Sequence, residues 1–196
     1  NNSVLTASPP QAFGFLGGNP SGKISFDGTR LVTSGSVNVA GGEVTLNDAR
    51  LVSESSTGNS GDIIVESDGV TIRKGQLRTE SMAGDAGRVI ISSRKPVLIE
   101  DPDAVPDSGE GLDRGEFIDN IRNRDVAFGD ETGALSLAKG GGNTDGITIS
   151  APSITIKGAG IYSVTSKNDT GELGNSGNIS LRTGTAILEN ARVQFG

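Results

Sequence analysis

The sequence predicts an all-β solenoid. One unit recurs along most of the chain, its apolar residues alternate with polar ones, and glycine-rich turns separate its strands. Each unit has an apolar-x-apolar pair after a glycine, a short loop, and a second such pair. The pairs are Val37/Val39 with Val44/Leu46, Ile63/Val65 with Val70/Ile72, Ile147/Ile149 with Ile154/Ile156, and Ile179/Leu181 with Ala186/Leu188. Units of this kind cannot bury an apolar face alone, so they must stack on one another.

A third apolar residue completes each unit, sixteen positions after its opening residue, and a small residue stands two positions before it. These anchors are Leu51, Leu77, Ile161 and Val193, and the small residues are Ala49, Gly75, Ala159 and Ala191. The alternation has a period of two, which indicates strands with one buried face. Two or three short strands per unit, separated by tight turns, suit a rung of a parallel β-helix. An antiparallel meander would more naturally show two-residue hairpin turns between similar strands.

Gly, Asn and Ser cluster in the turns, where they tolerate positive φ or bond their own backbone. The clearest examples are residues 58–61, 84–87 and 174–177. Because the turns would stack, we expect the Asn and Ser side chains there, such as Asn59 and Asn175, to form hydrogen-bonded ladders. This interpretation is favoured over a role for these side chains in sugar recognition.

The units open at residues 35, 61, 87, 145 and 177, which predicts about five rungs. The third unit also shows a one-residue slip, because its second pair is Val97 and Ile99, just after Pro96. A proline is tolerated at the beginning of a strand. The long gap between the third and fourth openings predicts one rung plus an insertion. The expected organisation is therefore a terminal segment and first rung or cap (1–34), rungs (35–99), an insertion outside the solenoid (100–139), and further rungs (140–196).

The insertion differs from the units in composition. It begins with an acidic, proline-bearing stretch that predicts a loop. Asp113 and Glu116 then have the spacing of a capping box, which predicts a short helix ending near Arg122 and Arg124. An insertion that interrupts a regular solenoid is where function concentrates, so it is the first candidate for a binding element.

Composition excludes several classes of function. The net charge of −7 and a pI near 4.6 argue against a nucleic-acid partner, because phosphate binding requires clustered Lys and Arg. Without cysteine there are no disulfides or thiolate metal sites. No apolar run approaches the roughly 20 residues of a membrane-spanning helix, so an integral membrane protein is not expected. The chain starts at Asn1 without a charged-then-apolar leader, and we expect it to be a piece of a larger protein.

The N-terminal stretch Val4-Leu-Thr-Ala-Ser-Pro-Pro-Gln-Ala-Phe-Gly-Phe-Leu16 resembles a segment of filamentous-haemagglutinin-like exoproteins, especially the large cyanobacterial ones. In that family the segment lies in the haemagglutination-activity, or two-partner-secretion, domain. Gly22-Lys-Ile-Ser-Phe26 and the glycines at 35, 41 and 42 look like the later part of that domain, and the unit ends Ala49-Arg-Leu51 and Ala191-Arg-Val193 look like the family's adhesin repeats. The resemblance covers nearly the whole chain except the insertion.

The resemblance implies a right-handed parallel β-helix that a partner transporter exports across the outer membrane of a Gram-negative-type bacterium. It implies a secreted or cell-surface adhesin that mediates attachment or cell–cell contact, with surface glycans or receptors on a host or neighbouring cell as partners. One departure is clear. The Asn-Pro motifs that the family's transporters recognise are not found, and Asn19-Pro20-Ser21-Gly22 is the nearest string.

The candidate binding residues are five acidic residues of the insertion and one aromatic. They are Asp101, Asp103, Asp107, Glu110, Asp113 and Tyr162. The acidic residues have oxygen ligands of the type calcium prefers, but their spacing matches no EF-hand, so a solvated loop is favoured and no metal or other cofactor is expected. Tyr162 follows the anchor Ile161, which predicts that it points outward, where an exposed aromatic ring can stack on a sugar.

Catalysis is the alternative hypothesis, because β-helices also carry polysaccharide lyases and glycosidases. Such enzymes need grouped carboxylates, which on a solenoid means the same position in adjacent rungs. The carboxylates found here, such as Glu43, Glu66, Glu80 and Glu172, are scattered, and histidine is absent. No catalytic residue is therefore predicted, and an enzyme is not expected. A carbohydrate-active enzyme and a purely structural or export scaffold remain the alternatives to an adhesin.

Overall fold

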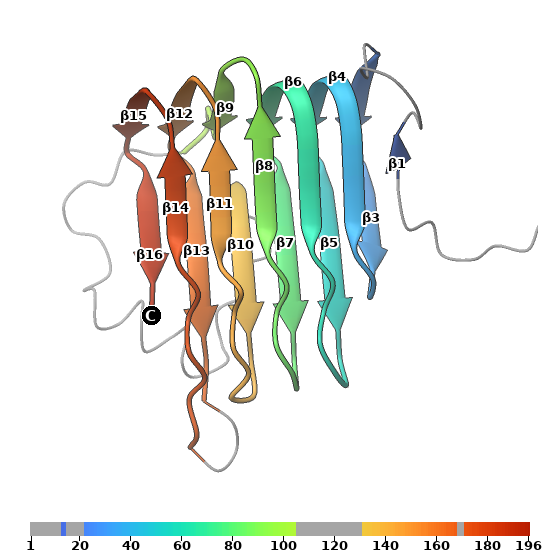
Figure 1. The fold of residues 1–196 in the computed structure, drawn as a ribbon, viewed down its shortest axis with the longest axis vertical. Helices are drawn as coiled ribbons and strands as arrows, with labels where there is room; N and C mark the ends of the chain where they lie inside the picture. The colour runs from blue at the N-terminus through green and yellow to red at the C-terminus, as the bar shows by residue number, and fades with distance from the viewer. Residues whose placement is uncertain (1–12, 15–21, 105–130, 168–170) are drawn as a thin grey trace, which may run out of the picture.

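The computed structural model describes residues 13–14, 22–104, 131–167 and 171–196, and it is all-β. The strands of these segments pair in parallel and form two sheets (Figure 1). The described segments contain no helix, and so none long and apolar enough to cross a membrane. The helix expected over 113–124 lies outside the described residues.

The first sheet has ten strands. In chain order they are β1 (Phe13–Gly14), β2 (Lys23–Asp27), β4 (Val37–Asn47), β6 (Ile63–Arg73), β8 (Val89–Ser93), β9 (Val97–Glu100), β11 (Ile147–Ser150), β12 (Ser153–Lys157), β14 (Ile179–Arg182) and β15 (Thr185–Glu189). The long strands β4 and β6 bend, and β6 pairs with both β8 and β9. The next unit therefore has two short strands, β8 and β9, at the positions that the single long strand β6 occupies in its own unit.

The second sheet has six strands, in the order β16-β13-β10-β7-β5-β3. They are β3 (Arg30–Thr33), β5 (Arg50–Ser55), β7 (Gln76–Ser81), β10 (Gly133–Ala138), β13 (Gly160–Thr165) and β16 (Arg192–Phe195). Figure 1 shows this sheet behind the first, with each unit passing from one sheet to the other.

The pairing register follows the repeat. Val37 pairs with Ile63, which pairs in turn with Val89, so the first apolar residues of three successive units stand in one row. The slip in the third unit is confirmed, because Val97 pairs with Val70 and Ile99 with Ile72. Equivalent positions of the unit therefore lie side by side on neighbouring strands.

Stacking of equivalent positions produces continuous rows of apolar side chains between the sheets. One row is formed by Phe26, Leu46, Ile72, Ile99, Ile156 and Leu188, and the row of third anchors by Leu31, Leu51, Leu77, Ala134, Ile161 and Val193. The central members of both rows are fully buried. These are the apolar positions that the repeat pattern predicts.

Two columns of glycine let the turns stack closely. A Cβ on Gly142 would lie 1.9 Å from the carbonyl oxygen of Gly84, and one on Gly174 would lie 1.9 Å from that of Gly142. A Cβ on Gly61 would lie 2.3 Å from the backbone nitrogen of Ser36. No real Cβ approaches backbone atoms this closely, so these turns require glycine.

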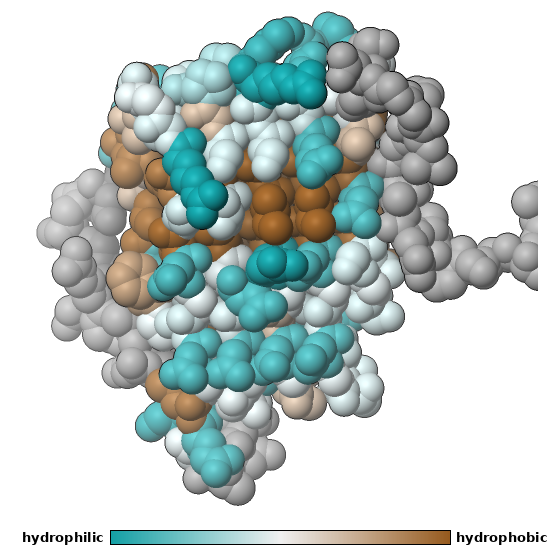
Figure 2. All heavy atoms as spheres, in the orientation of Figure 1, coloured by the Kyte–Doolittle hydropathy of each residue, from teal (hydrophilic) through white to brown (hydrophobic). Residues whose placement is uncertain are grey.

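The predicted turn ladders are confirmed, although aspartate joins them. The Asn59 side-chain oxygen accepts the backbone N–H of Asp85 (2.9 Å), and the Asp85 carboxylate accepts that of Asn143 (2.7 Å). The Asn143 oxygen in turn accepts the N–H of Asn175 (2.9 Å). Figure 2 shows a hydrophilic row across the lower end of the molecule, where the turns lie. Each side chain thus satisfies the backbone of the next unit.

The insertion is shorter than the sequence predicts. Residues 133–138, which the spacing of the units assigns to it, form β10, and Ala134 pairs with both Leu77 and Ile161. In the fourth unit only residues 158–159 separate the paired positions 157 and 160, whereas residues 101–132 separate the equivalent positions in the third. The insertion therefore lies within 101–132. Ala134 is not recognisable as an anchor in the sequence because this stretch separates it from the rest of its unit.

Candidate ligand-binding groove

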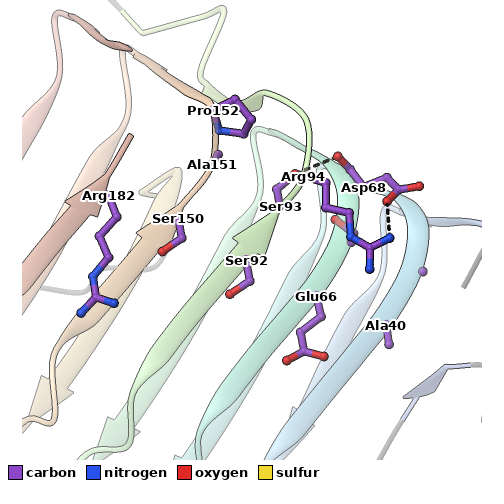
Figure 3. A pocket seen from close by; sticks show the side chains of 12 residues that line it. Ala40, Glu66, Asp68, Ser92, Ser93, Arg94, Ser150, Ala151, Pro152 and Arg182 are labelled. Atoms are coloured by element: carbon purple, nitrogen blue, oxygen red, sulfur yellow. Dashed lines mark hydrogen bonds and ion pairs between the residues drawn. The ribbon is translucent and has the colours of Figure 1, made fainter. Parts of the chain in front are cut away.

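A groove of about 670 Å³ runs along the bend of the first sheet. It crosses the middle of β4 and β6 and the C-terminal ends of β8, β11 and β14 (Figure 3). Its lining is mostly small or polar: Ala40, Gly41, Glu66, Ser67, Asp68, Ser92, Ser93, Arg94, Ser150, Ala151, Pro152 and Arg182. Side chains from five successive units therefore share one surface.

The centre of the groove is a single row of paired positions. It consists of Ala40, Glu66, Ser92, Ser150 and Arg182, each in register with the next. All five residues have partly or fully exposed side chains. Since neighbouring strands lie ~4.8 Å apart, three strand spacings place Glu66 about 14 Å from Arg182. We call the four polar side chains, from Glu66 to Arg182, the groove row.

Hydroxyl side chains shape the bend. The Ser67 hydroxyl donates to the carbonyl of Gly69 (2.9 Å), and that of Ser93 donates to the carbonyl of Lys95 (2.8 Å). Thr183 repeats this contact with the carbonyl of Thr185 (2.8 Å). Such local bonds offer the backbone an alternative to the extended ladder and turn the strand there. Three of the five units, those that open at 61, 87 and 177, therefore have a Ser or Thr that bends the strand at the same position, whereas Gly41 and Ala151 occupy this position in the other two.

The charges in the groove are only partly compensated. The Arg94 guanidinium donates to the Asp68 carboxylate at 3.5 Å, as the dashed line in Figure 3 shows. Among the described residues, Glu66 and Arg182 have neither an ion-pair partner nor a side-chain hydrogen bond. At about 14 Å they are also too far apart to neutralise one another. The groove row therefore has an available carboxylate at one end and an available guanidinium at the other.

These groups suit a ligand with many hydroxyls. Ser92 and Ser150 can each donate and accept hydrogen bonds, Glu66 accepts them, and Arg182 presents a planar fork of donors. The small residues Ala40 and Ala151 line the groove without filling it. One strand spacing is close to the length that one pyranose ring adds to an extended polysaccharide, so groove and sugar chain have similar periods.

Two of the predicted acidic binding residues lie away from the groove and have structural contacts. The Thr132 hydroxyl donates to the Asp101 carboxylate at 3.0 Å, which joins the two ends of the insertion. Asp103 forms an ion pair with Lys74 and raises the pKa of that ammonium group through their hydrogen bond. Asp107, Glu110 and Asp113 lie outside the described residues. In the segments that the structure describes, no three His, Cys, Asp or Glu side chains are grouped to hold a metal ion.

The prediction that Tyr162 is exposed is wrong. Its ring lies on the outer side of the second sheet, as the alternation requires, but it is fully buried there with Leu135, Leu137 and Val164. Burial raises the pKa of its hydroxyl to about 12, and the nearby Glu131 contributes to this rise. The alternation of residues in β10 indicates this apolar cluster. Leu135 and Leu137 alternate with the inward Ala134 and Ser136, so the outer face of β10 is apolar.

The groove row cannot be recognised from similar residue types at equivalent positions, because its members differ in type. Glu66, Ser92, Ser150 and Arg182 each stand five residues after the opening of their unit, as does Ala40. Their identities differ, and only the position repeats. Comparing the units position by position, rather than collecting carboxylates, would have found the row.

No protein-family model, curated protein or solved structure matches the chain.

Proposed function

We propose that this chain is a binding module of a secreted bacterial adhesin, built as a right-handed parallel β-helix of about five rungs, and that its groove holds glycans. The observation that carries this proposal is the groove row, whose four hydrogen-bonding side chains stand one strand spacing apart with both charged ends available. A surface of this kind can follow an extended sugar chain along the stack.

The β-helical architecture is supported by the pairing of equivalent positions in successive units and by the passage of each unit through both sheets. A crystal structure would test it directly. Successive rungs that coil with the opposite hand, or close on themselves without coiling, would contradict it.

Export and location follow from the resemblance to filamentous-haemagglutinin-like exoproteins. An outer-membrane two-partner-secretion transporter would move the parent protein to the cell surface, where the module contacts glycans of a host or neighbouring cell. Deleting residues 1–50 from the parent should abolish secretion. Normal secretion of the deleted protein would refute this part of the proposal.

A glycan array tests binding. The wild-type chain is compared with Ser150→Tyr, which places a bulky ring in the groove, and with Thr148→Tyr, a control two residues earlier on the same outward face of β11. A fourth chain has residues 104–130 replaced by a glycine-serine linker, which spares β10. Saturable binding that only Ser150→Tyr abolishes supports the groove. Loss only in the linker chain would place recognition in the insertion, and no binding by any folded chain would favour a structural or export scaffold.

A carbohydrate-active enzyme is the second candidate, because Glu66, Asp68 and two guanidinium groups share the groove. General acid and base catalysis by paired carboxylates is the usual chemistry of glycoside cleavage. Incubation with polysaccharides that the array identifies, followed by an assay for new chain ends, would test it. Release of new ends that Glu66→Gln abolishes would establish the enzyme.

A further inference from the structure

We propose that the groove selects acidic oligosaccharides, and that Arg182 forms the subsite for their anionic substituent. This inference rests on the proposed glycan-binding function and names the ligand class of the same groove. The distribution of charge along the groove row and the contacts of each charged side chain support it.

The two cationic side chains of the groove differ in their availability. The Arg94 guanidinium is held by Asp68, so an incoming anion would compete with a carboxylate already in place. Arg182, the last residue of β14, is exposed and has no such partner in the described chain. An anionic ligand therefore gains most at Arg182, which can bind a carboxylate or sulfate through two parallel N–H donors.

The opposite end of the row sets the orientation. The Glu66 carboxylate repels an anionic substituent and accepts hydrogen bonds from neutral hydroxyls. Ser92 and Ser150 lie between the two ends, each one strand spacing from its neighbours. An oligosaccharide in the groove should therefore direct an acidic sugar towards β14 and neutral hydroxyls towards β6.

Calorimetric titration can measure this selectivity. The probes are a neutral tetrasaccharide that ends in a single galacturonate, its methyl ester, which has the same sugar ring without the charge, and the same neutral tetrasaccharide with one terminal sulfate in place of the uronate. We expect the wild-type chain to bind the uronate probe about tenfold more tightly than its ester, since a hydrogen bond to a charged group is worth about 1.5 kcal/mol or more. A preference for the sulfated probe instead would identify the anion as a sulfate ester and still support the subsite.

Variants assign the preference to its residue. Arg182→Gln should remove the tenfold preference without weakening binding of the ester, and Arg182→Lys should keep part of it, because the charge remains without the fork. Arg30→Gln is the matched control, since Arg30 is an exposed arginine of β3 in the other sheet. The wild-type preference should also shrink as salt is raised, because the subsite is exposed.

The outcomes separate this inference from the proposed function. Equal binding of acid and ester by the wild-type chain, with Ser150→Tyr still abolishing both, would overturn the Arg182 subsite and leave the glycan-binding groove in place. A preference for acid that survives in Arg182→Gln would overturn the subsite too. If none of the probes and no glycan of the array binds, both proposals fall.

Discussion

The first and last repeat units have strands at equivalent positions but differ in burial. Leu46 of β4 and Leu188 of β15 belong to one row of the core, yet their exposed fractions are 0% and 51%. Leu51 and Val193, in the row of third anchors, differ in the same way, with 0% and 42%. The repeat pattern therefore suffices to specify strands, whereas burial depends on having a neighbouring unit on both sides. Stability in such a stack comes largely from the interfaces between units.

The largest expected effect is a core truncation inside the stack. Leu46→Ala should lower the free energy of unfolding by about 2–5 kcal/mol, because it removes buried methyl groups and leaves a cavity. Leu188→Ala removes the same atoms from a half-exposed site and should cost about 1 kcal/mol. Urea denaturation of the two variants measures both values. Equal losses would show that the last unit is buried in solution, for example by association with another chain.

The sequence predicts the repeated parts of this molecule well. Each apolar position occurs once per unit, so the assignment of a residue in one unit can be checked against the equivalent residues in the others. The register, the slip at Val97 and the turn ladders follow from that redundancy. Single features were predicted poorly. The strand containing Ala134 depends on which segments meet across the insertion, and local spacing does not encode that. The burial of Tyr162 follows only once this strand, with its apolar outer face, is placed beside β13.

In the candidate site, too, the repeated features could be predicted from the sequence and the single features could not. Equivalent residues lie side by side in the groove because of the repeat, so its position follows from the sequence once the units are aligned. Its chemistry comes from residues that break the repeat, namely a glutamate, two serines and an arginine at one position. In three of the five units the bend is stabilised by a local hydroxyl contact such as that of Ser67, which periodicity does not reveal.

Glycine columns offer a second comparison between the start and the interior of the stack. Gly142→Ala should destabilise the chain by about 1–3 kcal/mol, since its Cβ would meet the backbone of Gly84. Gly58 begins the same column, and a Cβ there would meet no atom within 4 Å, so Gly58→Ala should change stability by less than about 0.5 kcal/mol. Thermal unfolding followed by circular dichroism compares them. Similar melting temperatures would mean that the turns do not stack as closely as described.

Tyr162 provides a test of the second sheet's outer face at alkaline pH. The hydroxyl has a pKa of about 12 in the folded chain and near 10 when unfolded. The unfolded chain loses this proton first, so the stabilisation is complete below pH 10 and declines as pH rises towards 12. We expect Tyr162 to contribute a loss of about 2 kcal/mol over this range.

Comparing wild type with Tyr162→Phe at pH 8 and pH 11.5 isolates this loss from the titration of lysines, which is common to both chains. The difference in unfolding free energy between the two chains should shift in favour of the variant at the higher pH. An unchanged difference would mean that the Tyr162 hydroxyl is accessible to water.

The smallest expected effect concerns the turn ladder. Asp85 lies inside the ladder, where its carboxylate accepts the backbone N–H of Asn143 at 2.7 Å and its side-chain N–H at 3.0 Å. Asp85→Ala should therefore cost about 1 kcal/mol, and Asp85→Asn, which keeps an acceptor, should cost less. Asn175 is the last member, and no N–H of the described residues donates to its side-chain oxygen. Asn175→Ala should cost under about 0.5 kcal/mol.

Hydrogen exchange at the Asn143 amide distinguishes the ladder from a general loss of stability. In Asp85→Ala this amide should exchange faster than in wild type, while the amides of β6 and β8 keep their protection. Asp85→Asn should restore slow exchange, because the carboxamide oxygen can occupy the place of the carboxylate oxygen. If Asn143 exchanges equally slowly in all three chains, its amide depends on another acceptor and the ladder is incidental to the stacking of the turns. If protection falls across both strands as well, the ladder supports the whole stack and its members act together rather than singly.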